Sequence, residues 1–115
     1  MRSELITERD DLVIRRLILE PGESMDWHTD ACRRFTVVVH GERLAIEYRD
    51  DGSLHTFDLS SGDVGWDEPE PRVHRAVNVG SSRYEEVVTF FREGAHIDPQ
   101  PRAGVAEPQA PRATP

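Results

Sequence analysis

The chain has 115 residues, a mass of 13.1 kDa and a formal net charge of −8, from 14 basic and 22 acidic residues. It is too short for a full doubly wound dinucleotide enzyme or an eight-stranded α/β barrel, which need ~200 residues or more. Its acidity disfavours general binding to nucleic acid or to an anionic membrane surface. Every basic residue is Arg, which excludes a Schiff-base lysine and the lysine of a phosphate-binding P-loop.

The single cysteine, Cys32, excludes an intrachain disulfide, which suits a reducing compartment. The first residues contain no apolar run of signal-peptide length, and no stretch is long and apolar enough for a membrane-spanning helix. We therefore expect a cytoplasmic protein.

Six runs rich in branched and aromatic residues follow one another, separated by turns that contain Gly or Pro. Turn signals near every tenth residue predict an all-β sandwich, jelly roll or small barrel. The predicted strands are residues 12–19, 35–40, 44–48, 54–59, 73–79 and 84–91. The first run also has some helical periodicity, but its branched residues and the Pro21-Gly22 turn favour a strand. Gly52 is suited to the positive φ of a hairpin turn.

The composition changes near residue 97. Residues 98–115 hold five Pro and four Ala, and Val105 is their one branched apolar residue. Such a segment buries too little apolar surface to offset the entropy of ordering it. The sequence therefore predicts a single folded domain over residues 1–97 and a disordered tail over residues 98–115.

Three side chains suggest a metal site. Residues two apart in a strand point to the same face, so His28 and Asp30 can project together. His74 lies in a later predicted strand, which a closed β architecture can bring beside the first. Two imidazoles and one carboxylate on one side of a metal suit Fe(II), with positions left open for substrate and oxygen.

The residues around these three resemble the two sequence motifs of the cupins. The first motif has Gly, His, His, Glu and Gly at set spacings, and the matching residues here are Gly22, His28, Asp30, Arg34 and Gly41. The second motif has Gly, Pro, Gly, His and Asn, and the matching residues are Gly62, Pro69, Pro71, His74 and Asn78. One extra residue precedes Pro69, and Pro71 replaces a Gly. The resemblance covers roughly residues 12–92, nearly the whole predicted domain.

This resemblance implies a double-stranded β-helix, the jelly-roll barrel of small bacterial cupins, which commonly form homodimers. It implies that His28 and His74 hold a divalent metal (Fe, Mn, Ni or Zn), with Asp30 in place of a histidine. The motif residues with backbone or turn roles are Gly22, Gly41, Gly62, Pro69 and Asn78. The run over residues 12–19 is a candidate partner strand for a second copy.

Arg34 stands where the cupin motif has Glu, and a guanidinium cannot ligate a metal. Two interpretations stay open. In one, His28, Asp30 and His74 bind a metal, and Arg34 orients a small carboxylate substrate of an oxygenase or isomerase. In the other, Arg34 takes the place of the metal, pairs with Asp30 and anchors a small organic anion. A third alternative is a non-catalytic dimeric barrel.

Several further residues have simpler interpretations. Trp66 lies within the second motif; core or barrel-rim packing is its default, and if a tryptophan lines a small-molecule site with Arg34, we assign that role to Trp66. Cys32 can share the inward face of His28, although a small buried apolar role is its default. The other histidines are assigned to turns, outward positions or the tail boundary: His40, His55 and His96.

Overall fold

The computed structural model describes residues 1–92, which form nine strands and no helix. The strands are β1 (Arg2–Arg9), β2 (Leu12–Leu19), β3 (His28–Asp30), β4 (Arg34–His40), β5 (Arg43–Tyr48), β6 (Leu54–Asp58), β7 (Val64–Asp67), β8 (Glu70–Asn78) and β9 (Tyr84–Phe91). In this part of the chain no helix is present that is long and apolar enough to cross a membrane. The predicted tail over residues 98–115, the last residues of the predicted domain and His96 lie outside the described residues.

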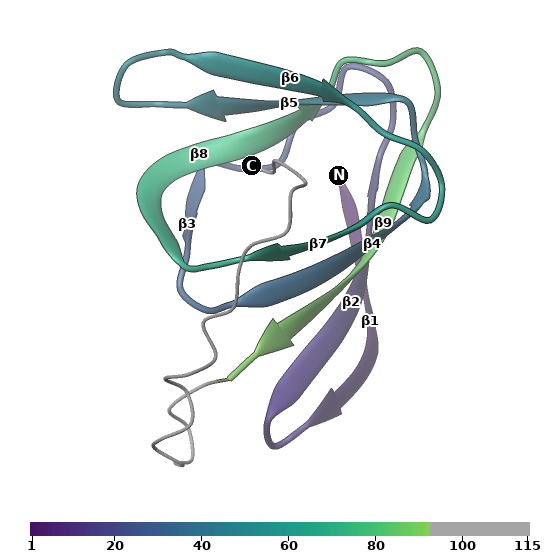
Figure 1. Cartoon of the computed structure of the whole chain (residues 1–115), viewed down its shortest axis with the longest axis vertical. Helices are drawn as coiled ribbons and strands as arrows, with labels where there is room; N and C mark the ends of the chain where they lie inside the picture. The colour runs from purple at the N-terminus through teal and green to yellow at the C-terminus, as the bar shows by residue number, and fades with distance from the viewer. Residues whose placement is uncertain (93–115) are drawn as a thin grey trace.

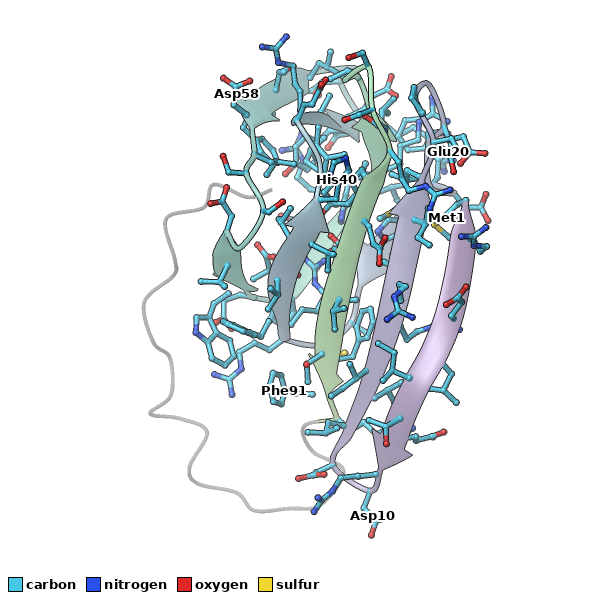
Figure 2. All side chains as sticks on the ribbon, turned by 90° about the vertical axis from the view of Figure 1, so that its right-hand side faces the viewer. Met1, Asp10, Glu20, His40, Asp58 and Phe91 are labelled. Atoms are coloured by element: carbon cyan, nitrogen blue, oxygen red, sulfur yellow. The ribbon has the colours of Figure 1, made fainter. Side chains whose placement is uncertain are left out.

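Two antiparallel sheets face each other and curl into a small barrel (Figure 1). One sheet has the strand order β1-β2-β9-β4-β7, and the other has the order β3-β8-β5-β6. The hairpin of β1 and β2 extends the first sheet beyond the barrel, and Asp10 marks its tip (Figure 2). The all-β jelly-roll barrel predicted from the sequence is therefore confirmed.

The sequence locates six of the nine strands and misses β1 and the two shortest. The bounds of β2 and β9 agree to the residue with the predicted runs 12–19 and 84–91. Three strands were not predicted. All eight residues of β1 are exposed, so its sequence shows no buried face. The other two, β3 and β7, have three and four residues, which is too few for alternation to be visible.

The core lies between the sheets, where alternate residues point inward. In β4 the side chains of Thr36 and Val38 are buried, and in β9 those of Tyr84 and Val88 are. The main apolar cluster joins both sheets and consists of Leu19, Val38, Leu44, Ile46, Tyr48, Leu59, Ala76 and Tyr84. Gly41 allows this packing, because a Cβ there would lie 2.7 Å from Cδ1 of Tyr84. Gly52 has a φ of 73°, as its hairpin turn requires.

Asn78 connects the end of β8 to two other segments. Its Nδ2 donates hydrogen bonds to the carbonyl oxygens of Leu19 and Ser82, both at 2.9 Å. Its Oδ1 accepts a hydrogen bond from the backbone N–H of Gly80 at 2.9 Å. The side chain is 1% exposed, so water cannot replace these bonds. Asn78 thus has the turn-capping role predicted from its position before Gly80.

We predict that Asn78→Ala lowers the free energy of unfolding by about 3 kcal/mol, because it leaves buried donors and acceptors without partners. Denaturant unfolding followed by tryptophan fluorescence measures the change. Thr56→Ala, at an exposed position of β6, is the control and should change stability by less than about 0.5 kcal/mol. Equal effects of the two substitutions would contradict this role for Asn78.

Candidate metal and ligand site

The site begins with two histidines on neighbouring strands. His28 in β3 and His74 in β8 are cross-strand partners, and their ring centroids lie 4.6 Å apart. Each Nδ1 lies 2.7 Å from a backbone carbonyl oxygen two residues earlier, that of Asp26 or Arg72. A carbonyl oxygen only accepts, so each Nδ1 donates to it, and both Nε2 atoms face the interior, where that of His74 hydrogen-bonds the Asp30 carboxylate.

Asp30 lies between the two exposed ring nitrogens. His74 Nε2 is 2.9 Å from Asp30 Oδ2, and His28 Nε2 is 3.5 Å from Asp30 Oδ1. One ligand atom from each of the three residues lies within 4.8 Å of the others. The two nitrogen–oxygen separations suit neighbouring ligands of one ion with bonds of about 2.1 Å. The structure therefore brings the three predicted ligands together, and their donor set fits a divalent metal.

Arg34 approaches the same carboxylate from the other sheet. Its NH2 group lies 3.1 Å from Asp30 Oδ2 and 3.7 Å from Asp67 Oδ2. The sequence predicts the pair with Asp30, but it places both residues on one strand face. Instead the chain leaves the four-stranded sheet after Asp30 and enters the five-stranded sheet at Arg34, so the residues between them form a corner. The ion pair therefore links the two walls of the barrel.

Two carboxylates that sequence reasoning missed also line the interior. Asp67 ends β7 opposite Arg34, and its side chain is 10% exposed. Glu86 is 8% exposed in β9 and accepts a short hydrogen bond from the hydroxyl of Tyr84. The alternation of Tyr84, Glu86 and Val88 was the available signal for Glu86, because it places all three on the inward face.

The interior holds two adjoining cavities. The inner cavity, of about 50 Å³, is bounded by His74, Asp67 and the apolar core. The outer cavity, of about 230 Å³, lies between the corner after β3 and the strands β2 and β9. Their shared wall consists of Met25, His28, Arg34 and Glu86. The inner space holds only a few water-sized groups, whereas the outer one has room for a small organic molecule.

Tyr48 packs behind the metal-ligand cluster. It is the cross-strand partner of His74, and the two ring centroids lie 5.8 Å apart. The guanidinium carbon of Arg72 lies 3.9 Å from the centroid of the Tyr48 ring. Burial, reinforced by the nearby Glu70 carboxylate, raises the pKa of Tyr48 above its usual value. Tyr48 is therefore uncharged, and its ring packs against the His74 ring and fixes its position.

Trp66 lies away from both cavities. Its neighbour Asp67 points into the barrel, and Trp66 packs on the outside of the sheet against Phe35 and Phe91, with ring centroids 4.8 and 5.6 Å away. The carbon of the Arg33 guanidinium lies 5.5 Å from the centroid of the Trp66 ring. Phe91, the last residue of β9, is labelled in Figure 2. The assignment of Trp66 to a ligand site thus has no support from these two cavities.

The remaining sequence candidates fall into two groups. Cys32 lines the outer cavity, which agrees with an inward position. His40 and His55 are both exposed, as predicted for turn and outward positions. His55 makes an edge contact with Tyr48, with ring centroids 5.7 Å apart.

The barrel resembles several solved structures. It superimposes on a cupin domain from Bordetella pertussis with a TM-score of 0.70, at 16% identity over 79% of this chain and 92% of that chain. A double-stranded β-helix protein from Klebsiella pneumoniae gives 0.61, at 22% identity over 80% and 76% of the two chains. A cupin family protein from Methanocaldococcus jannaschii gives 0.62, at 16% identity over 78% of each chain. The chain has the cupin fold.

No protein-family model matches the chain, and no curated protein does. At sequence identities of 16–22%, the similarity to these structures shows the cupin fold of this chain but nothing about its substrate. Within the cupin barrel, His28 and His74 occupy neighbouring strands as the motif resemblance implies. Arg34, at the position of the fourth cupin ligand, instead binds the Asp30 carboxylate.

We predict that Arg34→Gln lowers the free energy of unfolding of the metal-free protein by about 3 kcal/mol, because it leaves the carboxylates of Asp30 and Asp67 without their shared cation. Chemical denaturation in the presence of a chelator measures the change. Arg43→Gln removes an exposed ion pair with Asp58 and should cost less than about 1 kcal/mol. Equal costs would show that the buried pair adds nothing.

Proposed function

We propose that this protein binds one divalent metal through His28, Asp30 and His74 and uses it on a small organic molecule held in the adjoining cavity. The observation that carries the proposal is the convergence of three ligand atoms within 4.8 Å. The hydrogen bonds from both Nδ1 atoms support it, since metal-bound histidines in proteins are commonly oriented by such contacts.

The charges of the interior favour a cation over an anion. Three carboxylates line it, those of Asp30, Asp67 and Glu86, against the single guanidinium of Arg34. The formal charges of these four side chains sum to a negative value, so a divalent cation is attracted and a lone organic anion is repelled. Arg34 is also engaged by two carboxylates already, which weakens it as the sole anchor of an anion. The metal-dependent interpretation is therefore preferred over the metal-free one.

When bound, the metal would supply Lewis acidity or oxygen activation, which suits an oxygenase or isomerase of small acids. The protein residues have separate tasks. The carbonyls of Asp26 and Arg72 hold the imidazoles in the tautomer that presents Nε2. Arg34 fixes the Asp30 carboxylate and provides a positive edge for a polar group of the substrate.

Metal analysis of the purified, tag-free protein after incubation with Fe(II), Mn(II), Ni(II) or Zn(II) tests the proposal. We expect about one ion per chain in the wild type and a loss of most of it in His74→Ala, because that change removes one of the three proposed ligands. His55→Ala is the matched control, since His55 is exposed and outside the cluster. Oxygen uptake with small carboxylic acids then separates an oxygenase from an isomerase.

If the protein binds none of these ions after reconstitution, the result contradicts the proposal. The metal-free alternative would then be tested by thermal shift with small anions in the presence of a chelator. Stabilisation that is lost in Arg34→Gln would support Arg34 as the anchor of an anion.

Arg34→Glu provides a gain-of-affinity test. The substitution restores the carboxylate of the cupin motif and removes a positive charge 3.1 Å from the ligand Asp30. We predict that metal affinity rises at least about tenfold, which corresponds to ~1.4 kcal/mol. Titration against a competing chromophoric chelator measures it. Arg34→Gln should give a smaller gain, because it removes the charge without adding a ligand, and Arg43→Gln should give none.

A further inference from the structure

Apolar side chains line part of the outer cavity. Leu17 of β2 and Phe90 of β9 come from the five-stranded sheet, and Met25 belongs to the wall shared with the inner cavity. The corner after β3 adds the small side chains of Ala31 and Cys32. Leu17, Met25 and Phe90 are only partly buried, so a ligand that covers them removes further apolar surface from water.

The charged side chains of the same wall already have partners. The NH2 group of Arg34 lies 3.1 Å from Asp30 Oδ2 and 3.7 Å from Asp67 Oδ2. Glu86 accepts the hydrogen bond from the Tyr84 hydroxyl. The side chain of Asp30 is 7% exposed, and Glu86 is 8% exposed. A charged group on a ligand would therefore compete with contacts that these residues already make.

These contacts make the outer cavity unfavourable for a ligand group of either charge. A charged group loses its water when it enters a cavity, and only a close partner offsets that loss. An anion would also be repelled by the carboxylates of Asp30 and Glu86, which both line the cavity. Unlike a metal ion, which the two histidines would also ligate, a cationic organic group would have to draw one of these carboxylates away from Arg34 or Tyr84. An uncharged group meets neither cost.

The size of the outer cavity sets the size of the group that it can hold. At about 230 Å³ it exceeds the roughly 150 Å³ of an engineered apolar cavity that binds benzene. A six-membered ring with a short substituent, or a branched chain of similar size, therefore fits. Met25 can adapt to either shape, because its side chain is unbranched and flexible. Met25 and His28 line both cavities, so a ligand that contacts them lies next to the metal-ligand cluster.

We infer that the outer cavity binds the uncharged hydrocarbon part of a small ligand, a substituted ring or a branched chain, packed on Leu17, Met25 and Phe90. The inference deepens the proposed function and rests on it for the use of this ligand by a metal. In a small acid, the group that enters the outer cavity is then the ring or chain and not the carboxylate. Binding of the hydrocarbon itself needs no metal, because these three side chains lie outside the metal-ligand set.

Three probes of one shape test the charge preference in the wild-type protein with a chelator present. They are benzyl alcohol, which is uncharged, benzoate, which is an anion, and benzylamine, which is a cation at neutral pH. Titration followed by the backbone amide signals in nuclear magnetic resonance spectra gives each dissociation constant. We expect benzyl alcohol to bind at least about tenfold more tightly than either charged probe, because it enters the cavity without losing the hydration of a charge.

The same spectra locate the bound probe. We expect the largest shifts of the amide signals at residues 29–32, which include the corner after β3 and line the outer cavity. The indole N–H signal of Trp66 is the control, because Trp66 packs with Phe35 and Phe91 and lines neither cavity. If benzyl alcohol shifts the Trp66 signal and leaves residues 29–32 unchanged, it binds at the aromatic cluster, and the inference is wrong.

Substitutions at Leu17 test the apolar wall. Leu17→Trp should weaken the binding of benzyl alcohol at least about fivefold, because the larger side chain leaves less space in the cavity. Leu17→Asn keeps a similar volume but exchanges hydrocarbon for an amide, and it should weaken binding at least about threefold. Ile14→Trp and Ile14→Asn are the matched controls, because Ile14 is also partly buried but lies on the opposite face of the same strand. They should leave binding unchanged, and unfolding curves establish that each variant is folded.

The inference and the proposed function fail separately. If benzyl alcohol does not bind, or binds no more tightly than benzoate or benzylamine, the inference is wrong, and this comparison needs no variant to fold. The metal proposal is then judged by the metal content of the reconstituted protein alone. If benzyl alcohol is preferred in chelator but no metal binds on reconstitution, the inference is supported and the metal proposal fails. An effect of the Ile14 variants as large as that of the Leu17 variants also contradicts the inference.

Discussion

The carboxylate of Asp30 is the contact on which the arrangement of the barrel interior depends. It is 7% exposed and lies within 3.5 Å of two imidazoles from the four-stranded sheet and of a guanidinium from the other sheet. A charge so far from water needs partners, and here the partners come from both walls. The same contact therefore ties the sheets together, holds Arg34 inside and aims the two histidines at one point. The Asp30 carboxylate is therefore both a structural link between the sheets and a candidate metal ligand.

That sharing sets up a competition at Asp30. In the metal-free state Arg34 is the positive partner of the carboxylate, and a bound divalent ion would take over part of this role. The cupin motif avoids the competition by placing Glu at this position. If the proposed metal binds, Arg in place of Glu would cost metal affinity while it stabilises the metal-free barrel, and Asp67, opposite Arg34 on β7, would remain a partner of the guanidinium when the metal occupies Asp30. A chain that folds without metal and binds it reversibly is the expected result.

The fold and three site residues were predictable because their signals are local. Branched residues between turns indicate strands β2 and β9. The spacing of His28, Asp30 and His74 resembles that of the cupin motifs. Glu86 was not found, because an acidic residue in a strand is usually solvated, although its alternation with Tyr84 and Val88 places it on the inward face. Trp66 was assigned to the ligand site from its place in the motif. Successive side chains of a strand point to opposite faces, and because the neighbouring Asp67 points into the barrel, Trp66 lies on the outside. The corner between Asp30 and Arg34 is likewise a property of tertiary closure, which no local pattern encodes.

The position of His28 determines how the two cavities communicate. It is 33% exposed, far more than His74, and its ring lies in the wall that separates the inner space from the outer one. A ligand in the outer cavity that contacts this ring restricts the imidazole whose Nε2 faces Asp30. If a metal and a ligand bind as proposed, their binding would be coupled, and by linkage each would change the affinity of the other by the same factor. Arg34 also lies in this shared wall, and it contacts Asp30 through its NH2 group. The barrel thus places candidate metal ligands in the wall shared by the two cavities, so that occupation of one cavity would be felt at the other.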